Sequence, residues 1–236
     1  MIDKRAVSAA RNNAEWCEAM CRAHGLSGVL GARAWTSGSR TPLLYPDAVT
    51  LTEDATADDV LDAVSTGPGC SVKDSFATLD LSGAGFHVLF EAQWLHREPG
   101  LPAPAAPDGV VWSRLDTPGE LAEWAAAWGG GDGPAHLFRP ELLSDPSVAF
   151  LAGRAGDRLS AGAVVSRGGD AVGISNLFAA DGGDLDAAWA GCLSTVYARC
   201  WRNGGSASKQ GSATLRRRFA KGAVPWGPSG YLAWRA

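Results

Sequence analysis

Hydrophobic positions near the start of the chain recur at helical spacing. Intervals that alternate between three and four residues place these positions on one face of a helix; they are Val7, Ala10, Ala14, Cys17 and Cys21. His24 and Gly25 then supply a stop signal. The spacing therefore predicts an amphipathic helix over residues 2–24. A shorter helix over residues 57–65, with Thr56 as its N-cap, is predicted further on.

Alternation with a period of two predicts strands in the first half of the chain. The runs 72–81 and 86–96 are joined by a Ser-Gly-Ala-Gly turn, and residues 48–51 form a shorter candidate. One face of the second run is uniformly apolar; it consists of Phe86, Val88, Phe90, Ala92 and Trp94. The opposite face mixes polar and apolar side chains and includes Glu91.

A stretch without periodicity, residues 98–108, contains four prolines and predicts a domain boundary. We therefore assign residues 1–104 to an N-terminal α/β half and residues 109–236 to a second domain. Thr117, Pro118 and Glu120 form a helix-start signal in the second domain. Its predicted elements are a strand at 110–114, a helix ending near 128, an antiparallel meander at 148–153, 158–167 and 171–179, helices at 185–200 and 211–221, and a last strand at 230–235.

Composition narrows the class of protein. The 236 residues are 46% hydrophobic and 19% charged, an ordinary globular balance. The net charge of −4 argues against a nucleic-acid binder. No apolar run approaches the roughly 18 residues of a membrane helix, and the first residues lack an apolar signal segment. The five cysteines form no tight framework, which predicts reduced thiols in a cytoplasmic protein. We expect a monomer or homodimer that contacts neither nucleic acid nor membrane.

The order of elements in the second domain resembles the GNAT acyltransferase superfamily. AVGISNLFAAD at 171–181 is similar to the central strand that opens to admit acyl-CoA, and residues 212–234 are similar to the closing helix and strand. EWCEAMCRAHG at 15–25 and the run at 70–94 resemble the first half of two-part bacterial GNAT-like proteins. The resemblance implies an α/β fold with a mixed, largely antiparallel sheet flanked by helices, and a smaller N-terminal half. That half can be interpreted as a degenerate GNAT-like repeat.

The resemblance also implies a chemistry: transfer of an acyl group from acetyl-CoA or another acyl-CoA to a small-molecule amine. Backbone groups of Leu177, Phe178 and Ala179 would bind the pantetheine, and Gly182 and Gly183 would meet the pyrophosphate at a helix N-terminus. The chain departs from the family pattern here, because Asp181, Asp184 and Asp186 would repel a pyrophosphate. The alternative interpretation of this turn is a helix N-terminus that Asp184 caps.

The usual acid and base are missing at their family positions. The strand at 172–179 offers only Ser175 and Asn176, and the closing segment has Phe219 where members carry a tyrosine. Our candidate base is Glu91, whose pKa burial would raise, and our candidate acid is Tyr231. Substrate-binding candidates are Trp94, which supplies an aromatic wall, and Asn176. The alternative for Glu91 is a carboxylate at the rim that pairs with an arginine.

Other residues were weighed and given structural interpretations. Lys73 and Asp74 are predicted to be a surface ion pair. Cys17, Cys21 and His24 share a helical face without a second ligand pair, so no metal site is predicted. Arg216, Arg217 and Arg218 form a basic cluster on the predicted helix. It can be interpreted as a solvated helix face or as a contact to an adenosine phosphate or an acidic substrate. The second functional hypothesis is a GNAT-fold protein that has lost CoA chemistry and binds or converts a metabolite in the cleft between its halves. A third is a partner-binding protein with a tryptophan-rich surface.

Overall fold

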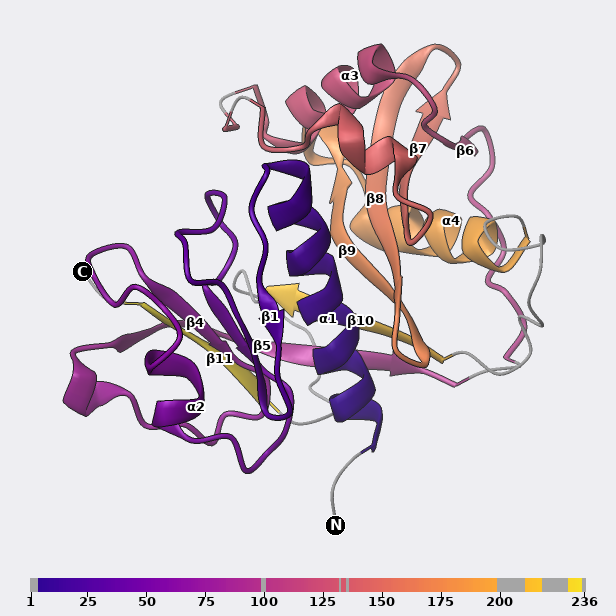
Figure 1. The fold of residues 1–236 in the computed structure, drawn as a ribbon. Helices are drawn as coiled ribbons and strands as arrows, with labels where there is room; N and C mark the ends of the chain where they lie inside the picture. The colour runs from indigo at the N-terminus through magenta and orange to yellow at the C-terminus, as the bar shows by residue number, and fades with distance from the viewer. Residues whose placement is uncertain are drawn as a thin grey trace. The chain divides into compact units, whose positions relative to one another are not determined.

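The computed structural model describes residues 4–98, 101–131, 133–134, 136–198, 211–217 and 229–234, with only the backbone for 197–198 and the last two segments (Figure 1). The chain divides into two compact units. Unit 1 combines residues 1–96 with 168–171 and 213–236, and unit 2 combines residues 97–167 with 172–212. Each unit is a mixed α/β structure. None of the helices within these ranges combines the length and hydropathy of a membrane-spanning helix.

Unit 1 is built on a sheet with strand order β1-β2-β3-β4-β11-β5-β10. Its elements are α1 (Lys4–Ala23), β1 (Val29–Leu30), β2 (Ala34–Thr36), β3 (Ala48–Thr50), α2 (Ala57–Leu61), β4 (Ser71–Asp74), η1 (Ser82–Ala84), β5 (His87–Arg97), β10 (Gly211–Arg217) and β11 (Ser229–Trp234). The β3–β4 pair is parallel, whereas β1–β2, β2–β3, β4–β11 and β5–β11 are antiparallel.

Alternating side chains of this sheet bury two separate cores. On one face, Cys17 and Cys21 of α1 pack with Trp35 and Val49. On the other face, Val60 of α2 packs with a second set of buried residues; this set contains Ala34, Ala48, Cys70, Val72, Leu81 and Phe86. The helical spacing in the sequence therefore predicted the buried face of α1 correctly. Burial raises the pKa of both the Cys17 and Cys21 thiols to about 12, so they are neutral apolar groups at physiological pH.

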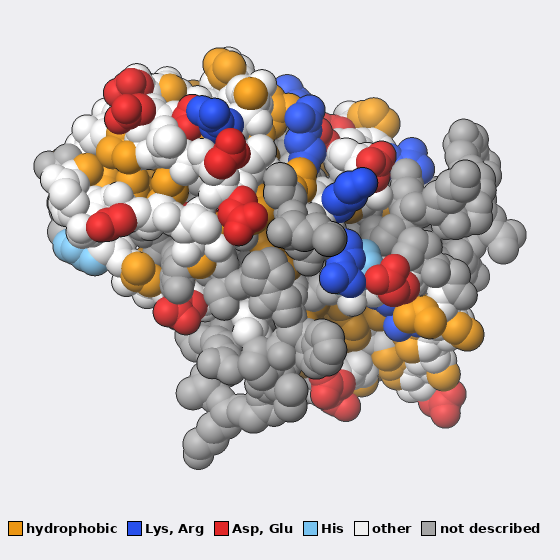
Figure 2. Space-filling view, turned by 90° about the horizontal axis from the view of Figure 1, so that it is seen from below, with side chains coloured by type: hydrophobic (Ala, Val, Ile, Leu, Met, Phe, Trp, Pro, Cys, Tyr) orange, Lys and Arg blue, Asp and Glu red, His pale blue; other side chains and the backbone are white. Residues whose placement is uncertain are grey.

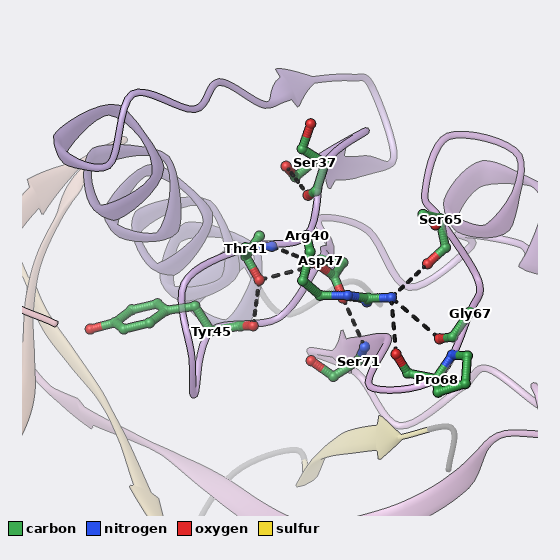
Figure 3. Close-up of polar contacts among 10 residues, drawn as sticks. Ser37, Arg40, Thr41, Tyr45, Asp47, Ser65, Gly67, Pro68 and Ser71 are labelled. Carbon is green, nitrogen blue, oxygen red and sulfur yellow. Dashed lines mark hydrogen bonds and ion pairs between the residues drawn. The ribbon is translucent and has the colours of Figure 1, made fainter. Parts of the chain in front are cut away.

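A buried carboxylate ties together the loops at one end of this sheet (Figure 3). Asp47 is 1% exposed and precedes β3. Its Oδ1 accepts from the backbone N–H of Thr41 at 3.0 Å, and its Oδ2 accepts from the N–H of Ser71 at 3.0 Å. Arg40 pairs with the same Oδ2 and reaches across to the carbonyl of Ser65 at 3.1 Å. Asp47 thus holds the loop before β3, the loop after α2 and the start of β4 in one arrangement.

Unit 2 has the strand order β9-β8-β7-β6 with helices on both faces. Its elements are β6 (Val111–Arg114), α3 (Pro118–Trp128), η2 (Pro140–Ser144), β7 (Val148–Ala155), β8 (Arg158–Gly168), β9 (Ala171–Ala179), η3 (Ala180–Gly182) and α4 (Leu185–Ala198). Helix α3 begins with a capping box, in which Thr117 accepts from the N–H of Glu120 and the Glu120 carboxylate accepts from the N–H of Thr117. The predicted meander and this helix start are confirmed.

Aromatic residues cover one face of the unit 2 sheet. The ring of Trp124 on α3 makes edge contacts with Phe138, Phe150 and Phe178, at centroid distances of 5.2, 5.1 and 5.2 Å. The Trp124 Nε1–H donates to the carbonyl of Leu151 at 2.9 Å, so the buried indole is satisfied. The other face packs smaller side chains against Ala188, Cys192 and Leu193 of α4. Helices α3 and α4 therefore bury opposite faces of the same sheet.

Three predicted elements differ from the structure. The helix predicted over 211–221 is wrong where it is described, because residues 211–217 form strand β10. The strand predicted over 72–81 ends at Asp74, whose carboxylate accepts the N–H groups of Phe76, Thr78 and Leu79 and folds the chain into a loop. The last strand, assigned with the second domain, pairs with β4 and β5 and belongs to unit 1.

Candidate functional site

The regular alternation of side chains between the two faces of the sheet is interrupted within strand β9. Val172 and Ile174 belong to the core beneath α4, and Leu177 packs against the same core. A regular strand would place residues 172, 174 and 176 on one face and residue 177 on the other. Asn176 lies between them with φ at +50°, a left-handed conformation that asparagine tolerates better than most residues. One extra residue is therefore inserted at Asn176, which is a β-bulge.

The bulge redirects the end of the strand. Beyond Asn176, Leu177 and Ala179 pack toward the α4 side, while Phe178 contacts Trp124 on the α3 side. Residues 171–174 are buried, but residues 175–180 are all partly exposed. A bulge interrupts the hydrogen-bond ladder and bends the strand. The second half of β9 is therefore an accessible segment of backbone attached to a rigid, buried first half.

A tight, exposed turn follows β9. Asp181 and Gly182 have φ values of +52° and +72°, and the N–H of Gly183 donates to the carbonyl of Ala180 at 2.9 Å. A Cβ added at Gly182 would meet no atom within 4 Å, so the turn is open on that side. Gly182 is required here mainly for its positive φ. The turn leads directly into the N-terminus of α4.

The carboxylates at this turn have specific partners. Asp184 Oδ1 accepts the N–H groups of Asp186 at 2.8 Å and Ala187 at 3.2 Å, which caps α4. Asp181 Oδ2 pairs with Arg158 Nη1 at 3.0 Å on the surface. The helix N-terminus, the position in this turn where backbone amides favour an anion, therefore already holds a carboxylate of the chain itself. The capping interpretation of Asp184 is confirmed.

Comparison by sequence and comparison by structure give different results. No family model matches the chain, and no curated protein matches it significantly. A GCN5-related N-acetyltransferase from Kribbella flavida superposes with a TM-score of 0.60 at 14% identity, over 96% of this chain and 95% of that protein. A protein assigned to the GNAT acetyltransferase family from Novosphingobium aromaticivorans gives a TM-score of 0.54 at 13% identity, over 98% and 99% of the two chains.

The chain has a GNAT-like fold. The predicted fold class, a mixed and largely antiparallel α/β structure with flanking helices, is thereby confirmed. At these identities the likeness concerns the fold, and it extends over both units. Within the GNAT-like fold, the bulged strand β9 and the turn into α4 are the segments that the sequence prediction had assigned to CoA. The chemistry of this site is therefore argued from these residues.

The two predicted catalytic residues lie in unit 1, apart in the chain from the turn. Glu91 of β5 and Tyr231 of β11 are register partners in adjacent antiparallel strands, so their backbones lie side by side. The expectation that Glu91 is buried is wrong, because Glu91 is exposed. It lies on the face opposite to Ala92 and Trp94, and the solvent on that face leaves its carboxylate hydrated. The roles of Glu91 and Tyr231 remain predictions.

Trp94 is a core residue of unit 1. It is buried, its Nε1–H donates to the carbonyl of Ser75 at 3.0 Å, and its ring lies 4.6 Å from Lys73 Nζ. A substrate contact would require this packing to open, so we do not include Trp94 in the candidate site. The prediction of a surface pair at Lys73 and Asp74 is wrong, since both side chains are buried. The apolar residues beside them, at 70 and 72, were the available signal in the sequence.

Proposed function

We propose that this protein transfers an acyl group from a CoA thioester to the amine of a small molecule. The observation that supports the proposal best is the bulge at Asn176, which leaves the second half of β9 accessible immediately before a glycine turn and a helix N-terminus. An extended pantetheine arm needs backbone donors and acceptors, and a diphosphate needs backbone amides. These features fit CoA in polarity.

Different residues would contact different parts of CoA. Backbone groups of Leu177, Phe178 and Ala179 would hydrogen-bond the pantetheine. Gly182 and Gly183 would allow the diphosphate to approach the turn closely, although the N–H of Gly183 already donates to Ala180. Phe178 is held by Trp124, so the strand would present a rigid edge. Asn176, with its side chain beside Ser175 at 3.1 Å, would be the polar group nearest the acyl end.

The reaction places modest demands on acid and base groups. The neutral amine attacks the thioester carbonyl carbon, the C–N bond forms, the C–S bond breaks, and the thiolate leaves and takes up the proton released from nitrogen. A thiolate is a good leaving group, so positioning of the two reactants supplies most of the acceleration. We therefore propose a small, uncharged or weakly basic amine as acceptor. We also propose a cytoplasmic monomer or homodimer without nucleic-acid or membrane partners. The described part of the face in Figure 2 carries both acidic and basic side chains, which is consistent with a protein that does not bind nucleic acid.

The alternative is a GNAT-like protein that has lost CoA and binds or converts another metabolite. The capping contacts of Asp184 favour it, because a diphosphate must displace this carboxylate to reach the amides of Asp186 and Ala187. Asp184, Asp186 and the diphosphate would also lie within a Debye length, about 8 Å, and would repel one another.

Titration calorimetry with CoA and acetyl-CoA distinguishes the two functions. We expect binding by the wild type, and about tenfold tighter binding by Asp184→Asn, because asparagine keeps the cap and removes a charge beside the phosphates. Gly183→Val should abolish binding, since its Cβ would lie 3.1 Å from the Ala180 carbonyl and its methyl groups would block the turn. Asp116→Asn, an exposed carboxylate elsewhere in unit 2, is the matched charge control and should change little.

The outcomes separate clearly. Binding that is strengthened only by Asp184→Asn supports the CoA site, and release of free thiol with an amine present supports transfer. No binding at millimolar CoA by either the wild type or Asp184→Asn would reject the acyltransferase proposal and leave the metabolite-binding alternative.

A further inference from the structure

A lysine is buried between α1 and the unit 1 sheet. Lys73, on β4, is 7% exposed. Its Nζ donates to the side-chain carbonyl of Asn13 at 2.6 Å and lies 4.6 Å from the centroid of the Trp94 ring. Asn13 belongs to α1, and Trp94 belongs to β5, so the amine connects the helix to the sheet beneath it. Ser75, two residues further along, is also buried, and its hydroxyl has no partner among the described residues.

No described carboxylate forms an ion pair with this amine. Asp74, its neighbour in sequence, uses both oxygens to bind the Thr50 hydroxyl and the amides of Phe76, Thr78 and Leu79. On α1, Glu15 pairs with Arg11 and Glu18 accepts from Gly28 and Trp35. Strand β3 has no titratable residue, and the register partner of Lys73 on β11 is Leu232. His87 and Glu91 of β5 are exposed.

The titratable group that faces Lys73 is the thiol of Cys17 on α1. Its pKa is about 12, so the thiol supplies no negative charge near neutral pH. A carbonyl oxygen and an aromatic face stabilise an ammonium only in part. A buried ammonium without a counter-charge is costly.

We propose that Lys73 is a proton-dependent latch: α1 is held firmly on the sheet when the amine is neutral and is loosened when the amine is protonated. The geometry supports a latch because the same nitrogen contacts the helix through Asn13 and the sheet through Trp94. The neutral amine keeps its hydrogen bond to Asn13 and loses only the charge. The pKa of Lys73, lowered by burial from 10.5 to about 8, places the change near neutral pH.

The way in which stability depends on pH follows from the difference between the pKa of Lys73 in the folded chain and in the unfolded chain. The unfolded chain binds a proton at this lysine up to pH 10.5, whereas the folded chain releases it above about 8. Protons therefore favour unfolding, and stability from this group rises with pH between about 8 and 10.5. Cys17 and Cys21 act oppositely above pH 9, because their pKa values are raised in the folded state. Comparison with a variant that keeps both thiols removes their contribution.

The test measures urea unfolding of the whole chain from pH 7 to 9 for the wild type and Lys73→Met. We expect the ratio of their unfolding constants, wild type over variant, to fall about tenfold across this range. Lys4→Met, an exposed lysine on the same helix, is the control and should give a constant ratio. Hydrogen exchange should locate the change in the α1 amides, after correction for the intrinsic rate.

Two results would overturn the latch. One is a ratio for Lys73→Met that does not change with pH. The other is a pH-dependent stability with no change in α1 protection relative to the strands. If Lys73→Met does not fold, the proposal is tested on the wild type, whose four lysines are labelled with carbon-13 and titrated by NMR. One lysine should titrate near pH 8, and titration of all four near 10.5 would reject the proposal.

Discussion

Replacing Asp47 by alanine is expected to lower the free energy of unfolding by about 2 to 4 kcal/mol, because a buried backbone N–H that loses its acceptor costs about 1 to 3 kcal/mol, whereas the partner Arg40 is 38% exposed and stays in contact with solvent. The carboxylate is 1% exposed and binds Arg40 together with the amides of Thr41 and Ser71. Its removal leaves these amides without acceptors in a site that excludes water. Urea denaturation followed by far-UV circular dichroism measures the change.

The matched control for Asp47 is Asp181→Ala. Asp181 also pairs with an arginine, but the side chains of the pair are 65% and 79% exposed. Exposed pairs contribute about 0 to 1 kcal/mol, so this variant should be close to wild type. Equal effects of the two substitutions would mean that Asp47 is not the structural centre of the loops in Figure 3.

Gly162→Ala is expected to destabilise unit 2 by about 3 kcal/mol, at the upper end of overpacking costs. A Cβ at this position in β8 would overlap Trp124 Nε1 and lie 2.5 Å from Cε1 of Phe178. Neither ring can move freely, because the Trp124 N–H is bonded to Leu151 and the rings pack edge to face. The measurement is again urea denaturation followed by far-UV circular dichroism.

Gly119→Ala is the control for this substitution. Gly119 lies in the first turn of α3, and a Cβ there would meet no atom within 4 Å. Alanine favours a helix over glycine by up to about 1 kcal/mol, so the control should be neutral or slightly stabilising. A Gly162→Ala variant as stable as this control would contradict the packing described for Trp124. Because Phe178 also belongs to the proposed CoA strand, Gly162→Ala should weaken CoA binding as well.

Local signals in the sequence predicted local structure well. The helix-start signal at Thr117 placed α3, and the three short runs between residues 148 and 179 placed the meander β7–β9, because caps and short hairpins depend on a few neighbouring residues. The apolar spacing of α1 likewise identified its buried face. The resemblance to GNAT proteins, carried by the order of elements, led to the correct fold.

The early end of the strand predicted over 72–81 is a local effect, because Asp74 binds the amides of Phe76, Thr78 and Leu79. Most of the other errors concern interactions between residues that are distant in the sequence. Nothing near 211–217 reveals that this segment is a strand, since its arginines suit a helix as well. The burial of Lys73 depends on two distant residues. Asn13 lies sixty residues before it, and Trp94 lies on a later strand. The bulge at Asn176 has a weak local signal, an asparagine within a strand, which tolerates positive φ. The glycine turn and the Asp184 cap, by contrast, were both identified from neighbouring residues.

The position of β11 has a consequence for the protein while it is being synthesised. This strand, Ser229–Trp234, separates β4 from β5 in the sheet and pairs with both. Until the ribosome reaches it, β4 and β5 each expose an edge without a hydrogen-bonding partner. At about 5–20 residues per second, the interval between β5 and β11 lasts roughly seven to thirty seconds. During translation the nascent chain therefore carries two open strand edges, which are the usual starting points of aggregation.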